Sequence, residues 1–353
     1  MNTSKLKSKS KTFLAINFGC RVNAAETNLW SQVLIDQGFS PVIDFDSPSI
    51  ILVNTCSITK KGEKESINKI KFFHKKYPKS KIIVSGCADF KKIKNLENIS
   101  VFNNRQKETI IKKLSSCYNP KIKDKFSKTN RFLLKIQSGC TQFCSYCIVP
   151  FKRNYLYSLP INKAIETVNQ AVNNGYKEII ITGVNLDQYQ HDLPSLIKKI
   201  LDETKIKLIS FGSIPINCLT KDFISLYQCS EYKKRLSHFL HIPIQSGSNK
   251  ILEIMNRPYT KKDIITKFTN LKSNIANLKF GTDIIVGFPT ETNNDFEQTL
   301  DLCQKISFSK IHVFKFSPRP NTSARILFEN SPKISKDTIK FRSQQISQLQ
   351  SKN

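Results

Sequence analysis

The sequence predicts an α/β protein with an N-terminal parallel-sheet domain, followed by a larger domain whose parallel strands form a partial barrel. Two observations carry this prediction. Short apolar segments alternate with helical stretches along nearly the whole chain, which is typical of parallel sheets covered by helices. The second part of the chain holds six such apolar segments, fewer than the eight that close a full barrel. Hydrophobic residues make up 39% of the 353, an ordinary share for a globular protein.

The first domain is expected over residues 10–117. Apolar segments of strand length alternate in it with helical stretches that separate them. The expected strands are 12–18, 49–54 and 81–85, and the expected helices are 24–37 and 59–76.

Each of these three strands runs directly into a cysteine, namely Cys20, Cys56 or Cys87. In open parallel sheets, ligands bind outside the carboxyl ends of the strands. The three thiols are therefore expected to converge on one site, although they are distant in sequence. The competing interpretation is that they are packing residues, because cysteine is often buried.

A polar and basic stretch, 118–130, is expected to link the two domains. The second domain follows over 131–332, and a basic helix over 333–353 ends the sequence. The expected strands are 132–137, 178–182, 207–211, 239–244, 281–286 and 310–316. The helices expected between them include 163–174, 251–255, 262–271 and 294–305.

The charge balance is strongly basic, with 56 lysines and arginines against 27 acidic residues and a net charge of +29. Such a charge favours a polyanionic partner, and nucleic acid is the one we expect. Only nine of the cations are arginine, the better reader of phosphate and guanine. A lysine-rich composition of this kind also arises from an AT-rich coding sequence, whatever the function.

Targeting signals are not expected. No apolar run approaches the ~20 residues of a membrane span. The lysine-rich start is followed by an apolar stretch too short for a signal-peptide core. We therefore expect no membrane partner and a cytoplasmic location. Ten cysteines are too few for a disulfide scaffold in a chain of 353 residues, which agrees with a reducing compartment.

Three cysteines, Cys140, Cys144 and Cys147, lie within eight residues, directly after the first strand of the second domain. Their x3/x2 spacing differs from structural zinc sites, which pair two Cys-x2-4-Cys units or add histidines. A [4Fe–4S] cluster usually takes four thiolates, so three would leave one iron open for a ligand. Zinc remains an alternative. His238 and His241 are not expected to chelate a metal together, because residues three apart on a strand face opposite sides.

The chain resembles the radical S-adenosylmethionine (SAM) enzymes, whose signature is Cys-x3-Cys-x2-Cys with an aromatic residue before the third cysteine. Longer phrases make it similar to one family among them, the methylthiotransferases. These phrases are Phe18-Gly-Cys20-Arg-Val-Asn23, Asn54-Thr-Cys56-Ser-Ile-Thr59, Ser85-Gly-Cys87, Gln137-Ser-Gly-Cys140, Leu240-His-Ile-Pro-Ile-Gln245-Ser-Gly-Ser248 and Thr282-Asp-Ile-Ile-Val-Gly-Phe-Pro289. The resemblance runs from about residue 12 to the end.

The resemblance implies two [4Fe–4S] clusters and SAM as cofactors. Cys140, Cys144 and Cys147 match the ligands of the radical cluster, whose open iron binds SAM. Its reductive cleavage yields a 5′-deoxyadenosyl radical, which abstracts hydrogen from an unactivated C–H bond. Cys20, Cys56 and Cys87 match the ligands of an auxiliary cluster that presents the sulfur to be inserted. A second SAM supplies the methyl group.

The resemblance also implies a substrate. The Gly-Cys-Arg-Val-Asn phrase is most similar to the branch that methylthiolates C2 of N6-threonylcarbamoyladenosine 37 in tRNA. The isopentenyladenosine branch tends to have Gln-Met in place of Arg21-Val22, and Arg-Glu in place of Thr59-Lys60. The implied partners are the anticodon loop of ANN-decoding tRNA and an electron donor of unknown identity. The alternatives are isopentenyladenosine 37, an aspartate of a ribosomal protein, and a non-catalytic iron–sulfur protein that binds RNA.

SAM contacts are expected from Thr182 and Gly183, because a small residue at a barrel strand end allows close approach. Gln245 and Asp283 lie in family phrases, and Gln245 is a third candidate for SAM. Cys117, Cys218, Cys229 and Cys303 have no motif context and are expected to be packing residues.

Three departures from the family pattern stand out. Arg-Gly-Arg-x-Arg-Ser is here Arg153-Asn-Tyr-Leu-Tyr-Ser158, and Ser-Ser-x-Glu-Pro is here Gly212-Ser-Ile-Pro215-Ile. Relatives continue into a small RNA-binding barrel, the TRAM domain, whereas this sequence ends on the preceding helix. RNA binding is then expected on the lysine-rich surface of the remaining domains, or activity is weak.

Overall fold

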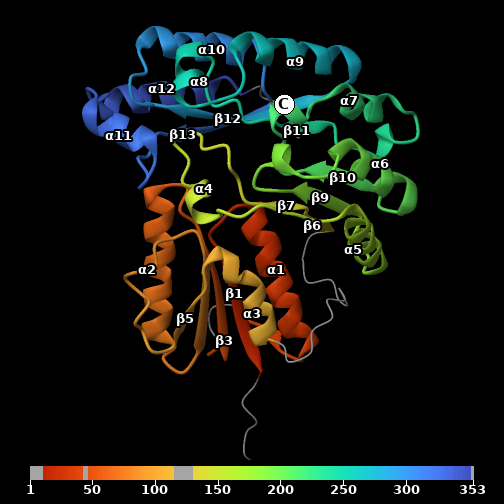
Figure 1. Cartoon of the computed structure of the whole chain (residues 1–353), viewed down its shortest axis with the longest axis vertical. Coiled ribbons are helices and arrows are strands. Elements are labelled where there is room, and N and C mark those ends of the chain that lie inside the picture. The colour runs from red at the N-terminus through yellow and green to blue at the C-terminus, as the bar shows by residue number, and fades with distance from the viewer. Residues whose placement is uncertain (1–10, 43–46, 115–129, 351–353) are drawn as a thin grey trace, which may run out of the picture. The chain divides into compact units, whose positions relative to one another are not determined.

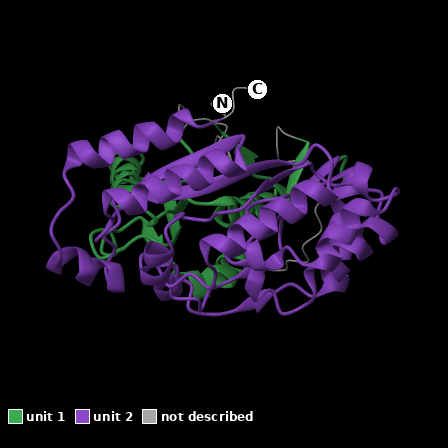
Figure 2. Ribbon diagram, turned by 90° about the horizontal axis from the view of Figure 1, so that it is seen from above, with its two compact units in different colours: residues 1–133, 173–175 green, residues 134–172, 176–353 purple. Residues whose placement is uncertain are grey.

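The structure, a computed structural model, describes residues 11–42, 47–114 and 130–350. The chain divides into two compact units (Figure 2), one of residues 1–133 and 173–175 and the other of residues 134–172 and 176–353. Cys117 and nearly all of the expected linker lie outside the described residues. None of the helices in the described ranges is long and apolar enough to cross a membrane.

The first unit is built on a five-stranded sheet with the order β2-β1-β3-β4-β5, and every neighbouring pair is parallel (Figure 1). The strands are β1 (Thr12–Asn17), β2 (Ser40–Pro41), β3 (Ile50–Thr55), β4 (Lys81–Gly86) and β5 (Ile99–Val101). The helices are α1 (Arg21–Asp36), α2 (Lys60–Lys76), η1 (Asn104–Gln106) and α3 (Lys107–Leu114). The predicted parallel-sheet domain is confirmed.

Alternate strand residues of this sheet point to opposite faces, so each face packs against its own helices. The buried residues on the face covered by α2 include Leu14, Ile51, Val53, Ile82 and Val84 from the strands and Ile67, Ile70 and Phe73 from the helix. Those on the other face include Phe13, Leu52 and Ile83, with Trp30, Val33 and Leu34 from α1 and Ile110 and Leu114 from α3. Because both faces are buried, the strands are nearly continuous apolar runs.

The second unit continues the strand–helix alternation. Its main strands are β6 (Arg131–Lys135, which crosses the boundary between the units), β9 (Glu178–Thr182), β10 (Leu208–Phe211), β11 (Phe239–His241), β12 (Lys279–Val286) and β13 (Lys310–Lys315). A short antiparallel pair consists of β7 (Gln137–Ser138) and β8 (Tyr157–Ser158). The helices are α4 (Val149–Lys152), α5 (Ile161–Asn173), α6 (Leu193–Glu203), α7 (Lys221–Gln228), α8 (Asn249–Ile254), α9 (Lys261–Asn274), α10 (Asn293–Ile306), α11 (Ser323–Asn330) and α12 (Lys336–Gln348).

The strands of the second unit form two three-stranded groups, β6-β9-β10 and β11-β12-β13. Backbone hydrogen bonds continue from one group to the other, because Ser237 N donates to Ile209 O (2.9 Å) and Ile214 N donates to His241 O (2.8 Å). The six strands therefore follow one another in chain order. This confirms the predicted partial barrel of six strands.

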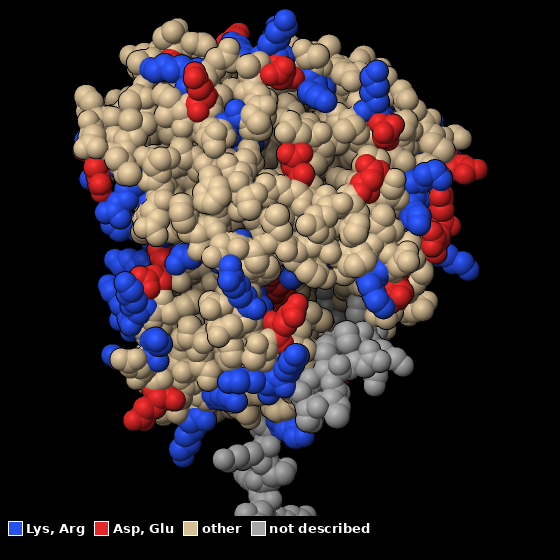
Figure 3. Space-filling model, in the orientation of Figure 1, with Lys and Arg blue, Asp and Glu red and all other residues tan. Residues whose placement is uncertain are grey.

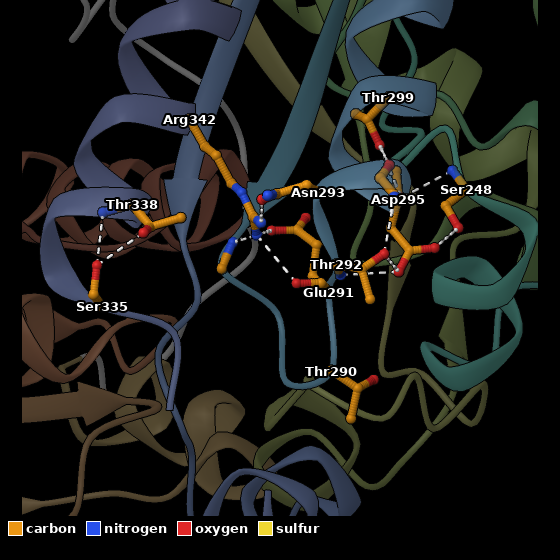
Figure 4. Close-up of polar contacts among 12 residues, drawn as sticks. Ser248, Thr290, Glu291, Thr292, Asn293, Asp295, Thr299, Ser335, Thr338 and Arg342 are labelled. Atoms are coloured by element: carbon orange, nitrogen blue, oxygen red, sulfur yellow. Dashed lines mark hydrogen bonds and ion pairs between the residues drawn. The ribbon is translucent and has the colours of Figure 1, made fainter. Parts of the chain in front are cut away.

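Helix α12 is anchored to the second unit by a buried ion pair (Figure 4). Arg342 Nη1 lies 2.6 Å from Glu291 Oε2, and Arg342 Nη2 donates to Asn293 Oδ1 (2.8 Å). Glu291 Oε2 also accepts from Gly287 N (2.8 Å). Gly287 has φ +72, and a Cβ there would lie 2.6 Å from Ile339 of α12. This glycine therefore allows the helix to approach the loop after β12.

Candidate functional site

The Cys140, Cys144 and Cys147 thiols lie on the loop between β7 and α4, and each is partly exposed. Their x3/x2 spacing along the chain differs from the paired Cys-x2-4-Cys units of structural zinc sites.

The shape of this loop depends on the residues just before Cys140. Gly139 has φ +89, and a Cβ at this position would lie 1.5 Å from the carbonyl oxygen of Tyr155. Only glycine fits there without moving the backbone. The next turn of chain is tied back by Arg153, a buried residue whose Nη1 donates to Ser138 Oγ at 2.9 Å. Arg153, retained from the family's arginine-rich run, thus supports the cysteine loop.

Hydrogen-bond donors surround two of the sulfurs. Asn185 Nδ2 lies 3.6 Å from Cys140 Sγ, and the Gln142 amide lies 3.5 Å from the same atom. Arg257 Nη1 lies 3.2 Å from Cys144 Sγ. Such donors stabilise negative charge on a thiolate and help to set the potential of an iron–sulfur cluster.

Burial opposes the ionisation of these thiols when no metal is bound. It raises the pKa of the Cys147 thiol to about 12, and it also raises the pKa of Cys140. A bound metal supplies the positive charge that removes these protons, so metal binding and thiol deprotonation are coupled. The donor set fits iron–sulfur ligation: three thiols and no other candidate ligand in the loop.

Ser145, between Cys144 and Tyr146, adds a second observation that fits such a cluster. Its hydroxyl is buried and has no hydrogen-bond partner among the residues that the structure describes. A buried hydroxyl without a partner is costly, by ~1–3 kcal/mol. Because it is next to a ligand in sequence, this donor is suited to a sulfur acceptor.

The structure brings two of the three SAM candidates beside the cysteine loop. Gly183 follows β9, and a Cβ there would lie 3.0 Å from Gln137 Cβ. Gln137 Oε1 accepts from Asn185 N (2.9 Å), while its Nε2 donates to Gly139 O (2.8 Å). Gln137 therefore joins the loop after β9 to the loop that carries Cys140. Thr182, just before Gly183, is buried, and its carbonyl accepts from Ile136 N (3.0 Å).

Gln245, the third candidate, lies on the other group of strands. Its amide donates to Asp283 O (2.9 Å) and its carbonyl accepts from Ile285 N (2.9 Å). In the described part of the chain, no hydrogen bond joins Gln245 to the cysteine loop. It adopts φ +70, which is uncommon for a non-glycine residue and occurs often at functional sites.

Cys20, Cys56 and Cys87 follow β1, β3 and β4, which are consecutive neighbours in the first sheet. The register pairs Asn17 with Asn54, and Thr55 with Gly86, so these strands end at the same edge. Cys20 is exposed and the other two are partly buried. The structure therefore places all three thiols at one edge of one sheet.

Side-chain amides hold the loops that carry these cysteines. Asn23 Nδ2 donates to Thr55 O (2.9 Å), and Asn104 Nδ2 lies 3.6 Å from Cys87 Sγ. Gly19 leaves room for Asn23, because a Cβ at Gly19 would lie 2.1 Å from Asn23 Nδ2. The phrase Phe18-Gly-Cys20-Arg-Val-Asn23 thus describes a turn whose last residue reaches across to β3.

A buried ion pair joins Lys107 of α3 to Glu26 of α1, near the carboxyl end of β3. Lys107 Nζ also lies 3.4 Å from Asn54 Oδ1. The hydroxyls of Ser57 and Ser85 are buried without hydrogen-bond partners in the described part of the chain, and both residues are close in sequence to a cysteine of the triple. In the first unit, these two hydroxyls correspond to that of Ser145, which lies beside Cys144 in the second unit.

Of the remaining cysteines, Cys218 and Cys303 are buried, as expected for packing residues, and burial raises the pKa of each to about 12. Cys229 is half-buried. The residues that the sequence alone did not identify are Gln137, Asn185, Arg257, Asn104 and Lys107. All of them act on residues distant in sequence, and only Gln137 lies in a recognised phrase.

Comparisons with known proteins divide the chain in the same way. Residues 134–303 match the Radical SAM superfamily, and residues 12–111 match Uncharacterized protein family UPF0004. The threonylcarbamoyladenosine tRNA methylthiotransferase MtaB of Chlamydia pneumoniae is 32% identical, over 89% of this chain and 76% of the relative. This chain belongs to the radical SAM methylthiotransferases. It is therefore an enzyme of that class, which uses SAM and a [4Fe–4S] cluster.

Other methylthiotransferases are similar to the same extent. The tRNA-2-methylthio-N(6)-dimethylallyladenosine synthase of Thermodesulfovibrio yellowstonii is 32% identical, over 90% of this chain and 78% of the relative. The solved structure of the radical SAM methyltransferase TsrM from Kitasatospora setae covers 90% of this methylthiotransferase and 77% of its own chain, with a TM-score of 0.63 and 11% identity. That likeness shows the fold.

Proposed function

We propose that this methylthiotransferase adds a methylthio group to C2 of N6-threonylcarbamoyladenosine 37 in tRNA, using two [4Fe–4S] clusters. The observation that carries the two-cluster part is the pair of cysteine triples, one at the carboxyl edge of the first sheet and one on the loop after β7. We assign the auxiliary cluster to the domain over 10–117 and the radical chemistry to the domain over 131–332.

The assignment of the substrate is supported by named relatives and by short phrases. Relatives in Chlamydia pneumoniae, Aquifex aeolicus and Thermotoga maritima, 30–32% identical, are named as threonylcarbamoyladenosine tRNA methylthiotransferases. The phrase with Arg21 and Val22 points to the same branch. Both residues begin helix α1, beside Cys20 at the strand-end site.

The radical site has clear roles for its own side chains. When bound, the cluster supplies the electron that cleaves SAM and so starts the removal of hydrogen from the substrate. Cys140, Cys144 and Cys147 would hold it, while Asn185 and Arg257 offset charge at two of the sulfurs. Gly183 would contact SAM through its backbone, since Leu186 and Gln137 take the space of a side chain there: a Cβ would lie 2.7 Å from Leu186 Cδ2 and 3.0 Å from Gln137 Cβ.

The auxiliary site has matching roles. Cys20, Cys56 and Cys87 would hold the second cluster, and the amide of Asn104 faces Cys87 Sγ. Asn23 fixes the turn of Cys20 against β3. A cluster held by three thiolates keeps one iron open, which is the position where a sulfur for transfer can bind.

A tRNA partner agrees with the charge of the enzyme. Figure 3 shows lysine and arginine side chains gathered over the first unit, while much of the second unit's visible face carries no charge. The exposed lysines of α2 are Lys60, Lys61, Lys64, Lys71, Lys75 and Lys76. Such side chains neutralise phosphates and release counterions, which favours RNA binding whatever its sequence.

The second candidate substrate is isopentenyladenosine 37, which the relatives' names give as dimethylallyladenosine. Relatives named for that reaction share the same level of identity. The test is mass spectrometry of tRNA nucleosides from a host that lacks its own threonylcarbamoyladenosine methylthiotransferase, with and without this gene. We expect 2-methylthio-threonylcarbamoyladenosine only when the gene is present. A variant with Cys144→Ser is the matched negative control.

The outcomes of this experiment separate the candidates. Methylthiolated dimethylallyladenosine, formed in a host that lacks the corresponding enzyme, would replace the proposed substrate by the second candidate. Neither product, with both clusters present in the purified enzyme, would contradict the proposed tRNA substrate. The next measurement would then be mass spectrometry of ribosomal proteins for a methylthiolated aspartate.

A further inference from the structure

Three side chains outside the cysteine sites converge on the strands β11, β12 and β13. His241 Nε2 lies 2.9 Å from Asp283 Oδ1, and His312 Nδ1 lies 3.2 Å from the same oxygen. The three atoms all lie within 4.8 Å of one another, the only such set of His, Cys, Asp and Glu ligand atoms in the described ranges. We call these residues the His–Asp–His trio.

The register of the sheet creates this convergence. Asp283 of β12 pairs directly with His312 of β13, and His241 pairs with Gly281, two residues before Asp283 on the same face. A Cβ at Gly281 would lie 2.8 Å from His241 Nδ1. Because Gly281 has no side chain, the His241 ring has room to lean across it to Asp283.

The trio lies on the sheet face that continues toward the cysteine loop. Ile285, two residues after Asp283, shares its face and belongs to a buried cluster with Ile251, Met255, Phe288 and Ala324. Tyr146, between Cys144 and Cys147, packs against that cluster. The opposite face is covered by helices, as Phe280 packs on Phe268 of α9 (4.8 Å between ring centroids).

We propose that His241, Asp283 and His312 form a binding site for a divalent transition-metal ion, with Zn²⁺ as the best match. Two imidazoles and one carboxylate are the protein ligands of many catalytic zinc sites, which leave a further position open. Ligands ~2.0–2.1 Å from one zinc ion lie ~3.3 Å apart in tetrahedral geometry. The observed 2.9 and 3.2 Å are close to that separation.

Accessibility agrees with an open site of this kind. The His241 side chain is 8% exposed, that of Asp283 21% and that of His312 46%. Two ligands are therefore fixed by their surroundings, and the third lies on the accessible side, where an ion can enter. The alternative is a trio held only by hydrogen bonds, with both imidazoles donating to Asp283 Oδ1.

The experiment is a zinc titration of the anaerobically reconstituted enzyme in competition with a chromophoric chelator. We expect one Zn²⁺ per chain in addition to the cluster iron. His312→Gln and Asp283→Asn should each weaken zinc binding by more than about 100-fold, since each removes a direct ligand. His238→Gln is the matched control, because the ring nitrogens of His238 lie against the backbone carbonyls of Ala276 and Lys233 and its ring packs on Tyr227, away from the trio.

X-ray absorption at the zinc edge distinguishes this site from zinc on unfilled cysteines. The trio should give nitrogen and oxygen neighbours at ~2.0–2.1 Å, whereas cysteine ligation gives sulfur at ~2.3 Å. Sulfur neighbours, equal affinity in wild type and His312→Gln, or no bound zinc would each overturn the proposal. The readout does not involve tRNA, so it is independent of the proposed function.

Discussion

Two glycines with left-handed backbones show how differently the same conformation is used in this enzyme. Gly139 has φ +89 and directly precedes Cys140, with the backbone of Tyr155 packed against it. Gly175 has φ +79 on the turn between α5 and β9, and a Cβ there would meet no atom of the described ranges within 4 Å. The first glycine is required by packing and by conformation, and the second by conformation alone.

Gly139→Ala should therefore cost more than Gly175→Ala. Gly175→Ala, the control, only places an alanine in the left-handed conformation. This should lower the free energy of unfolding by about 1 kcal/mol and the apparent Tm by roughly 2–4 °C. At Gly139 the clash with Tyr155 adds backbone displacement, for a total of about 2–5 kcal/mol. Thermal unfolding and iron content measure both effects, and we expect iron loss only in Gly139→Ala. Equal Tm values and equal iron content in the two variants would contradict this account.

At the residue scale, sequence reasoning identified the ligand candidates and missed their supporting groups. The six cysteines are recognisable because each stands in a short local phrase or directly after an apolar strand. Asn185 and Arg257 contact Cys140 and Cys144 from positions 45 and 113 residues away. No local pattern encodes such contacts, since they exist only after the strands have paired.

Secondary-structure elements were predictable where apolar residues recur with the period of a strand or of a helix. The strands β1, β3 and β4 and the helices α1 and α2 match their expected ranges closely, because their apolar residues follow the strand or helix period. The strands β2 and β5, of two and three residues, are too short for any period to be seen.

Two expected strands end earlier in the structure. The strand expected over 132–137 ends at Lys135, and the strand expected over 239–244 ends at His241. Pro243 lacks the amide hydrogen that a central strand needs. After Pro243, the regular backbone hydrogen bonds to β12 are interrupted. The Ile244 amide donates to the hydroxyl of Thr282 (3.2 Å) and not to a backbone carbonyl.

The buried ion pair of Arg342 and Glu291 fastens helix α12, and its loss should be costly. Arg342→Met leaves the Glu291 carboxylate buried without its cation, which should lower the free energy of unfolding by about 3–5 kcal/mol. The double variant Glu291→Gln with Arg342→Met removes both charges and should recover most of that loss. Urea unfolding of the three proteins measures this. A double variant less stable than Arg342→Met would contradict the uncompensated-charge explanation.

The Asp295 carboxylate, at the start of α10, should make the free energy of unfolding of the enzyme depend on pH. Asp295 accepts hydrogen bonds from Thr292 and Ser248 (Figure 4) and also from Lys250. Although burial opposes its charge, these bonds lower the pKa of Asp295 from 3.8 to about 2. Because the folded pKa is the lower one, this stability is present above pH ~4 and is lost as pH falls from ~4 toward ~2.

Asp295→Asn should therefore be less stable than wild type by roughly 1–2 kcal/mol at pH 7, since part of the bonding is retained by the amide. The difference should shrink as pH falls below ~4. Urea midpoints of the iron-free chains at pH 7, 4 and 3 provide the measurement. A stability difference that stays constant with pH would assign the effect to packing and not to charge.

At the scale of the whole molecule, the fold class was predictable because strand–helix alternation fills both units. The sequence also placed one cysteine triple in each half, and the structure has them on separate compact units. The His–Asp–His trio was not foreseen, although His241 and Asp283 lie in family phrases. It depends on the cross-strand register of β12 and β13, which a single sequence does not reveal.

The separation of the two cysteine triples predicts that their clusters can be removed independently. Reconstituted wild type should hold about eight iron and eight sulfide per chain, from two [4Fe–4S] clusters. Replacing Cys20, Cys56 and Cys87 by serine, or replacing Cys140, Cys144 and Cys147 by serine, should lower both numbers to about four. Each triple lies on a unit with its own core, so neither set of changes should unfold the other site.

The two variants should differ in chemistry, which makes the comparison more informative than iron content alone. Without Cys20, Cys56 and Cys87, the strand-end triple, the enzyme should still cleave SAM to 5′-deoxyadenosine on reduction but form no methylthio product. Without the Cys140 triple, 5′-deoxyadenosine itself should disappear. Chromatography of the nucleoside products measures both. If removing the strand-end cysteines left four iron fewer yet preserved the methylthio product, that cluster would not be the sulfur-presenting group, and its role would be structural.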